Sequence, residues 1–485
     1  MFFKFLNTNQ SMMKKFFLLL QLSIINYQLL IAQQPSSQPT NLVFNSVKPY
    51  NFILSFTPST ADGFLILKST HPITDIPVDG TTYQKGQGLT TCKVMNSNAG
   101  TSFQVREVVE RTKYYFKIFA YNGSGGSINY LLSNPLTDSV ITPAADAGNY
   151  FQGIDSTSAS FIADLHYLIN NHTMQTYTPG YANLLMPSIY VRDTIGGQEV
   201  INCEYSGETT VYTPPFGFVA TDYNREHVLC KSWMQTAAIF VANNLINYAE
   251  GADYYNLLLS RSVPNVKRSN NPLGIVVNQS WTYGSCKYGT DNTGNNVFEP
   301  RADRKGDAAR AMMYEMVCYD GLSGGWGLNE LLSQAYQQDQ NILKLWNQQD
   351  PPDKFERTKN ACINSVQHNR NPFIDHPGWA TCINFDSLIK TNLCGAASGV
   401  EQIFAEASVR IFPNPASQIF NLEIETLEFS DVEISVFDMY GRRILQSKIT
   451  EPKTTFDLSK AEAGNYLLHI SLNGQSAVRK LLVIR

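Results

Sequence analysis

An adjacent acid and imidazole, Glu226 and His227, have the clearest potential for chemistry in this sequence. A carboxylate suits a hard divalent cation, and an imidazole with a pKa near ~6.5 suits the removal of a proton from water. Neighbouring residues of an extended strand point to opposite faces, so both side chains can serve one site only at a strand end or a bulge. Such pairs are common, and the surrounding sequence has to decide whether this one is catalytic.

Four blocks of sequence surround this pair along the middle of the chain. They are 224–228 with 232–233, 253–257 with 266–270, 298–300 with 305–311, and 367–377. In this order they closely resemble the endonuclease I family of bacterial extracellular nucleases. The resemblance covers most of residues 147–385 and implies an α+β nuclease domain with a ββα-metal centre.

The resemblance also implies roles for individual residues. His227 matches the general base that deprotonates a water molecule. Glu226 and Asn256 match the two protein ligands of one metal ion, which would be Mg²⁺, with Mn²⁺ or Ca²⁺ as alternatives. The implied reaction is non-specific hydrolysis of DNA, and of RNA as a further substrate, to products with 5′-phosphate ends. Considered in isolation, Asn256 is equally typical of a loop or capping residue.

Arg268 and Arg310 lie in the matched blocks and are candidates for binding the nucleic-acid backbone, because a guanidinium can donate paired hydrogen bonds to phosphate. The alternative is an ion pair with Asp253, Asp303 or Asp307. The sequence leaves both interpretations open.

Two features weigh against an active nuclease. Tyr255 stands where the family often has histidine, and partners of metal ligands commonly contribute about 10- to 100-fold to activity. The net charge of −4 is not that of a general electrostatic binder of nucleic acid. A local basic patch could serve instead, and its candidates are Arg261, Lys267, Arg268, Arg301, Arg304 and Lys305.

The segment 36–143 is predicted to be an all-β module, since short apolar runs alternate with turns. Residues 112–122 resemble the late strand of a fibronectin type III domain, in which Tyr114 would be the tyrosine of the corner. The module is expected to be a spacer, with carbohydrate or protein binding as the alternative.

The carboxyl-terminal residues 407–485 resemble the sorting domain recognised by the type IX secretion system. The resemblance rests on the blocks 409–415, 436–442 and 464–470, followed by a basic end. It implies that the secretion machinery is a partner and that the protein crosses the outer membrane. Residues 386–406 are expected to be a linker.

The amino-terminal residues 1–33 have the pattern of a signal peptide, with Lys14 and Lys15 before an apolar stretch. No later segment approaches a membrane-spanning length, so the mature protein is expected to be secreted or at the cell surface. Export permits disulfide bonds among the eight cysteines, although their pairing cannot be read from spacing. Cys92 is predicted to be unpaired.

A chain of 485 residues is expected to form two to four domains. We therefore predict a multidomain protein in which N- and C-terminal β-sandwich domains flank the α+β nuclease domain. The competing hypothesis is a surface adhesin in which the flanking modules carry the function and the nuclease domain is degenerate.

Overall fold

The computed structural model describes residues 32–214, 216–234, 249–319, 338–391, 408–425, 432–438, 443–451, 453–472 and 475–484. Residues 1–31 of the predicted signal peptide and residues 392–406 of the predicted linker lie outside this range. The chain divides into two compact units, Met1–Thr391 and Asn392–Arg485. Among the described helices, none combines the length and the apolar character needed to cross a membrane.

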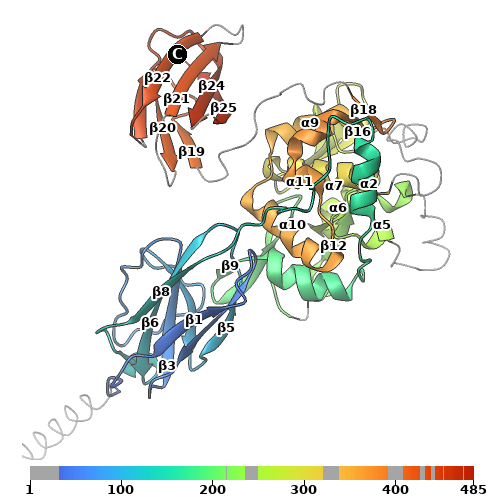
Figure 1. Ribbon diagram of the computed structural model, residues 1–485. Helices are drawn as coiled ribbons and strands as arrows, with labels where there is room; N and C mark the ends of the chain where they lie inside the picture. The colour runs from blue at the N-terminus through green and yellow to red at the C-terminus, as the bar shows by residue number, and fades with distance from the viewer. Residues whose placement is uncertain are drawn as a thin grey trace, which may run out of the picture. The chain divides into compact units, whose positions relative to one another are not determined.

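The first part of the chain consists of β-strands arranged in two antiparallel sheets (Figure 1). The strands are β1 (Thr40–Asn45), β2 (Phe52–Thr57), β3 (Gly63–Ser69), β4 (Lys93–Asn98), β5 (Ser102–Val105), β6 (Lys113–Asn122), β7 (Asn129–Tyr130) and β8 (Leu136–Ile141), with a short helix η1 (Gly125–Ser127). One sheet has the order β1-β2-β5, and the other has the order β4-β3-β6-β7 with β8 also paired to β6.

Alternation along these strands builds the core between the sheets. In β2, Phe52, Leu54 and Phe56 are buried while the residues between them are not, because successive side chains of a strand point to opposite faces. The hydroxyl of Tyr114 in β6 accepts a hydrogen bond at 3.0 Å from the backbone N–H of Val109, a few residues upstream. Tyr114 therefore has the contact predicted for the corner tyrosine.

The middle of the chain mixes small sheets with helices. Its strands are β9 (Val191–Ile195), β10 (Gln198–Asn202), β11 (Thr209–Val211), β12 (Tyr223–His227), β13 (Leu257–Arg261), β14 (Asn278–Tyr283), β15 (Cys286–Thr290), β16 (Asn296–Glu299), β17 (Ile383–Asn384) and β18 (Ile389–Lys390). The helices are α2 (Phe161–Asn170), η2 (Tyr181–Tyr190), α3 (Phe218–Thr221), η3 (Lys231–Trp233), α5 (Ala249–Ala252), α6 (Ser262–Arg268), η4 (Ala302–Arg304), α7 (Lys305–Cys318), α9 (Gln340–Gln349), α10 (Lys354–Gln367), α11 (Pro372–Asp375) and η5 (Pro377–Cys382). The pairing of β17 with β18 extends ordered structure into the range predicted to be linker.

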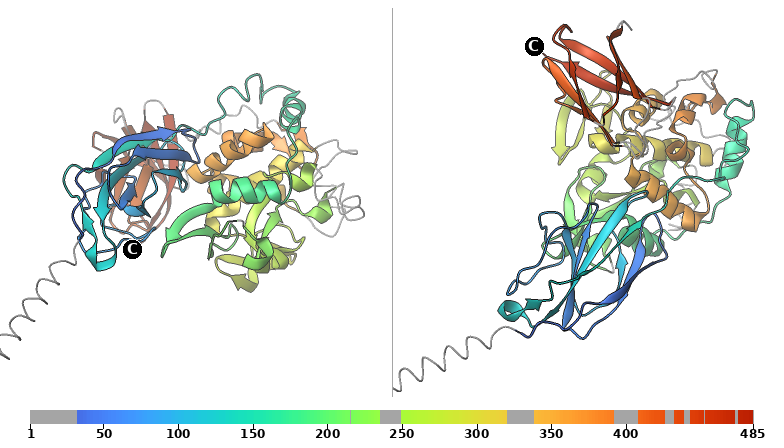
Figure 2. Two further views of the ribbon diagram at one scale, coloured as in Figure 1. Left: turned by 90° about the horizontal axis from the view of Figure 1, so that it is seen from below. Right: turned by 60° about the vertical axis from the view of Figure 1, so that its left-hand side comes forward.

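Helices and strands of this middle part lie on different sides. The orange helices α9 and α10 are grouped away from the yellow-green strands around β14 and β15 (Figure 2, left). Helix α7 lies at the centre, since every residue after Lys305 in this helix is buried. The small alanines and flexible methionines of α7 allow neighbouring elements to approach it closely.

Strands β12 and β13 form an antiparallel pair in which His227 lies opposite Leu257 and Glu226 lies opposite Leu258. Helix α6 follows β13 directly and contacts both strands. The leucines of β13 are buried, so the pair is anchored in the core. This strand–strand–helix unit is the scaffold on which Glu226 and His227 are presented.

Buried polar contacts join the sandwich to the middle part within the first unit. Glu110 is only 2 % exposed, and its carboxylate accepts hydrogen bonds from Arg357 and from the N–H of Ala145. The N–H of Glu110 donates to Thr358 Oγ1 at 3.0 Å. These contacts differ from the flexible spacer that the sequence suggested, because a buried ion pair holds both partners in one geometry.

The second unit is also built of two antiparallel sheets. Its strands are β19 (Ser408–Phe412), β20 (Ile419–Glu425), β21 (Val432–Asp438), β22 (Arg443–Ile449), β23 (Lys453–Asp457), β24 (Gly464–Leu472) and β25 (Gln475–Val483). The sheet orders are β19-β20-β23 and β22-β21-β24-β25. Phe420, Ile434 and Ile470 are among the buried residues of its core. The chain is thus multidomain, with many sheets and some helices, as predicted.

Candidate functional site

His227 lines a pocket of about 540 Å³ at the end of strand β12. Its Nε2–H donates a hydrogen bond of 2.8 Å to the carbonyl oxygen of Gly251, which leaves Nδ1 as the nitrogen with a lone pair. Burial, assisted by the ammonium group of Lys231, lowers the pKa of His227 to about 3. The imidazole is therefore neutral at ordinary pH, which is the form that a general base requires.

Glu226 lines the same pocket and is 4 % exposed. Its Oε1 accepts hydrogen bonds from the hydroxyl of Tyr205 and from Nη1 of Arg268, both at 3.1 Å. Within the described part of the chain, Oε2 accepts no hydrogen bond. Burial raises the pKa of Glu226 to about 7, although Arg268 and Tyr205 oppose this shift. One carboxylate oxygen is thus held in position and the other is available.

Both side chains reach one pocket because His227 is the last residue of β12. The sequence predicted that the pair could converge only at a strand end or a bulge, and the structure has a strand end. The ring of Tyr177 stacks on the imidazole, with ring centroids 5.4 Å apart and planes 20° from parallel. Tyr177 therefore restricts the orientation of His227 in the pocket.

Asn256 does not line this pocket. Its side chain is fully buried, its Oδ1 accepts a hydrogen bond from Leu229 N–H at 2.8 Å, and its Nδ2 donates to the Leu229 carbonyl at 3.2 Å. Both polar atoms of the amide are therefore used to hold the backbone that follows β12. The structure differs here from the expectation that Asn256 binds a metal ion.

Asn265 of helix α6 lines the pocket instead. It lies three residues before Arg268, so the two side chains share one face of the helix. Arg268 contacts Glu226, and Asn265 is therefore directed to the same side of the pocket. Its side-chain amide has no hydrogen-bond partner among the described residues. Sequence reasoning missed Asn265, although it directly precedes the matched block 266–270.

The walls of the pocket are polar and mainly cationic. Its lining residues are Tyr177, Asn224, Arg225, Glu226, His227, Cys230, Lys231, Ser232, Asn265, Arg268, Ser269 and Asn270. Glu226 is the one acid in this lining. The guanidinium of Arg225 lies 4.0 Å from the ring centroid of Tyr177 and forms no ion pair with any described residue. Such a pocket attracts an anion and holds one carboxylate within it.

The donor set fits a hard divalent cation. Glu226 Oε2 and the Asn265 amide oxygen are both unused by the described residues, and both are oxygen ligands of the kind that Mg²⁺ and Ca²⁺ prefer. Two protein ligands leave further coordination positions for water and for phosphate oxygens. The residues present are therefore compatible with one ion in this pocket.

The two arginines considered as phosphate ligands have different surroundings. Arg310 is fully buried, and its guanidinium donates to Glu356 at 2.8 and 2.5 Å and to Asp307 at 3.3 Å. It does not line the pocket, and the ion-pair alternative describes its geometry. Arg268 lines the pocket, but it is 1 % exposed and also donates to the carbonyls of His227 and Val228. The described contacts of Arg268 position Glu226 and the chain after β12.

The departure at Tyr255 lies away from the pocket lining. Its hydroxyl contacts Asn360 Oδ1 at 2.8 Å and the carbonyl of Asn369 at 2.9 Å. Tyr255 therefore cross-links the core beside α10. Among the cysteines of the described chain, Cys92, Cys203, Cys230, Cys286, Cys318 and Cys362 are free thiols. Cys92 is unpaired, as predicted.

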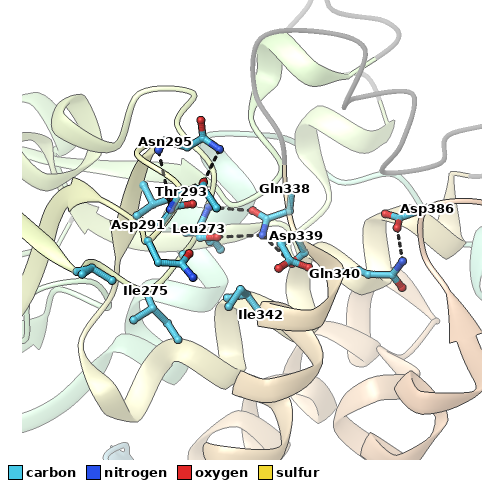
Figure 3. A pocket seen from close by; sticks show the side chains of 14 residues that line it. Leu273, Ile275, Asp291, Thr293, Asn295, Gln338, Asp339, Gln340, Ile342 and Asp386 are labelled. Carbon is cyan, nitrogen blue, oxygen red and sulfur yellow. Dashed lines mark hydrogen bonds between the residues drawn. The ribbon is translucent and has the colours of Figure 1, made fainter.

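Another pocket of about 490 Å³ lies beside strand β16 and helix α9 (Figure 3). Apolar side chains including Ile275 and Ile342 form part of its lining, and Asp291, Asp339 and Asp386 are also in it. No lysine, arginine or histidine is among its lining residues. A phosphodiester would be repelled by these carboxylates, so this pocket is unsuited to nucleic acid.

A buried group of His172, Asp253 and Cys318 has ligand atoms within 4.8 Å of one another. Asp253 Oδ2 already accepts hydrogen bonds from the hydroxyls of Tyr314 and Tyr319, both at 2.8 Å. Its Oδ1 accepts from two further donors, a backbone N–H and a glutamine amide. Because neutral donors satisfy this carboxylate, the group is a polar network of the core.

Comparison with known proteins identifies the family. Residues 157–378 match the family model described as Endonuclease I. The extracellular ribonuclease of Bacillus subtilis (strain 168) is 34 % identical over 249 residues, which are 49 % of this chain and 79 % of that protein. This chain belongs to the endonuclease I family. An extracellular ribonuclease of Bacillus amyloliquefaciens is 32 % identical over 283 residues, 56 % of this chain and 88 % of that protein.

An extracellular deoxyribonuclease of Aeromonas hydrophila is also similar to this endonuclease I family member. It is 30 % identical over 129 residues, which are 27 % of this chain and 51 % of that protein. The endonuclease I domain and these relatives make the chain a nuclease. Members of the family are generally metal-dependent, which agrees with the oxygen donors of the pocket.

The flanking parts of this nuclease also have relatives. Residues 410–484 match the model described as Secretion system C-terminal sorting domain, so the protein is secreted or held at the cell surface. Similar solved structures include the FN5 domain of Drosophila Lar, at 18 % identity over 22 % of this chain and 97 % of that chain, with a TM-score of 0.15. A TM-score this low adds no weight to the fibronectin-like topology of β1–β8.

Proposed function

We propose that this protein is a metal-dependent endonuclease that cuts DNA and RNA without sequence preference in the pocket beside β12 and α6. One observation carries the proposal: the neutral imidazole of His227, the Oε2 of Glu226 and the amide of Asn265 face one cationic pocket. Relatives named as ribonucleases and as a deoxyribonuclease support a substrate range that includes both nucleic acids.

His227 acts as the general base. The lone pair on Nδ1 accepts a proton from a water molecule, and the hydroxide attacks the phosphorus atom. The hydrogen bond from Nε2–H to Gly251 keeps the ring oriented and strengthens when the imidazole becomes positive. Departure of the 3′ oxygen then leaves a product with a 5′-phosphate end.

Glu226 and Asn265 hold the metal ion in this proposal, and Asn256 does not. A bound Mg²⁺, or Mn²⁺ or Ca²⁺ in its place, would stabilise the charge that develops on the phosphate and on the leaving oxygen. Arg268 fixes Oε1 of Glu226, so that Oε2 keeps its direction in the pocket. Arg225, which has no ion pair among the described residues, is available to bind a phosphate of the substrate backbone.

The test is nicking of supercoiled plasmid by the mature full-length protein, with magnesium and with EDTA. His227→Ala is compared with His71→Ala, which removes an exposed histidine of the sandwich. Cleavage should require metal and should fall by about 100- to 10,000-fold in His227→Ala alone. Absence of cleavage by folded protein in magnesium, manganese and calcium would overturn the proposal and leave the adhesin hypothesis.

A further inference from the structure

The hairpin of β14 and β15 exposes a row of aromatic side chains. No residue of β14 is buried, and this strand is the edge of the sheet β14-β15-β16. Trp281 lies directly opposite Tyr288 in the ladder. Tyr283 follows Trp281 by two residues and therefore points to the same face. The rings of Trp281 and Tyr283 are 7° from parallel, with centroids 6.1 Å apart.

Lys267 adds a positive charge to this row. Its ammonium group lies 4.2 Å from the ring centroid of Tyr288 and 5.9 Å from that of Trp281. It forms no ion pair with any described residue, so its charge is not neutralised by a neighbouring carboxylate. An aromatic row with such a cation offers two kinds of contact, one with flat rings and one with anions.

Helix α6 connects the aromatic row to the pocket. It contacts β15, and it also carries Asn265 and Arg268, which line the pocket. The helix has seven residues, which corresponds to a length of about 10 Å. Lys267 is thus only one residue from a side chain of the pocket. A strand bound with one phosphate in the pocket has neighbouring nucleotides within reach of the hairpin.

We propose that Trp281, Tyr283 and Tyr288, together with Lys267, bind the unpaired bases of a single-stranded nucleic acid next to the site of cleavage. The proposal rests on the nuclease function proposed above. Every base has a flat π face, so stacking on aromatic side chains holds single strands without a sequence preference. In a duplex these faces are stacked against neighbouring bases and are not accessible to the hairpin.

The competing explanation is that the aromatic residues only stabilise the hairpin, since cross-strand aromatic pairs do so. The two explanations differ in what they predict for substrates. Stabilisation of the hairpin would affect all substrates alike and would lower the melting temperature. Base stacking would affect single strands selectively and would leave the melting temperature nearly unchanged, because no residue of β14 belongs to the core.

The test compares the mature wild-type protein with the double variant Trp281→Ala/Tyr288→Ala. A second double variant, Trp281→Phe/Tyr288→Phe, keeps the flat rings. Tyr167→Ala serves as a matched control, because Tyr167 is 75 % exposed and is outside both the pocket and the hairpin. The substrates are a fluorescein-labelled single-stranded 20-mer and the same strand in a duplex, and kcat/KM is measured for each.

We expect kcat/KM for the single strand to fall at least about 10-fold in the alanine variant, and that for the duplex to change less than about 3-fold. The phenylalanine variant and Tyr167→Ala should behave as wild type. Equal losses on both substrates, or no loss on either, would overturn the proposal. Anisotropy in EDTA measures binding of the single strand without cleavage, so it tests the hairpin even if the nuclease function fails. If the double variant does not fold, the single variants Trp281→Ala and Tyr288→Ala replace it.

Discussion

The helical region around α7 and the region around the pocket treat their basic residues in opposite ways. In the helical region, Arg310 is completely buried and pairs with Glu356 and Asp307. Arg304 pairs with Glu204 at 3.2 Å, and Lys305 pairs with a neighbouring glutamate. The acids of this region are therefore matched to cations in its interior.

Near the pocket, Arg225, Arg261 and Lys267 form no ion pair with any described residue. Arg225 and Lys267 lie over aromatic rings, and Arg261 lies near tyrosine side chains. The difference explains why a net charge of −4 is compatible with a nuclease. Many acids neutralise structural cations, whereas the cations near Glu226 remain available to phosphate.

Removing Arg310 should have the largest effect on stability. Arg310→Met leaves Glu356 and Asp307 buried without their partner, which is expected to lower the free energy of unfolding by about 3–5 kcal/mol. Cleavage by the fraction that remains folded should not change. Urea titrations and plasmid nicking at low temperature measure the two quantities. A stable Arg310→Met variant that no longer binds DNA would restore Arg310 as a phosphate ligand.

The two asparagines separate metal binding from support of the loop. Asn265→Ala is expected to raise the magnesium concentration for half-maximal activity by at least about 10-fold, with little effect on stability. Asn256→Ala leaves the N–H and carbonyl of Leu229 without partners, and should lower the free energy of unfolding by about 1–3 kcal/mol. Magnesium titrations and denaturant melts measure both variants, and the reverse pattern would assign the metal to Asn256.

Glu315 is an exception to the pairing of the helical region. Both of its carboxylate oxygens are buried without a hydrogen-bond partner. Burial, together with Asp253 and Glu250, raises the pKa of Glu315 well above its ordinary value. As the pH rises above about 4.5, the unfolded chain loses this proton more easily than the folded protein, so the folded state becomes less favourable.

Glu315→Met should therefore stabilise the protein by about 2 kcal/mol at neutral pH, because it removes a buried acid without a partner. The gain should be smaller at pH 4.5, where the carboxyl group is largely protonated in both states. Thermal melts at pH 4.5 and pH 7.5 measure the difference, with Glu315→Gln as the polar control. A loss of stability at both values would show that the carboxylate has a partner after all.

The smallest expected effect concerns an unpaired cation of the pocket. Arg225→Gln should weaken binding of nucleic acid uniformly across sequences and reduce the slope of log affinity against log salt by about 1. Arg301→Gln is the matched control, because Arg301 already pairs with Asp303 at 3.2 Å. Binding is measured by anisotropy in EDTA between low and moderate salt. Equal slopes for the two variants would remove the distinction between paired and unpaired cations.

Local patterns in the sequence were sufficient for much of the architecture. Alternation of apolar residues predicted the strands of the sandwich, and Tyr114 was recognised because its role depends on residues only a few positions away. The adjacency of Glu226 and His227 also limited them to a strand end, where the structure has them. These features depend on short-range geometry, which a sequence specifies directly.

The tertiary structure alone decided which of two asparagines faces the pocket. Asn256 is used by Leu229, 27 residues earlier in the chain, whereas Asn265 shares a helix face with Arg268. It likewise decided that Arg310 pairs with Glu356, 46 residues later. A polar side chain hydrogen-bonds whatever partner folding brings to it, and burial then makes that contact costly to lose. Sequence determined the types of chemistry available, and long-range packing determined which residues remain free to perform it.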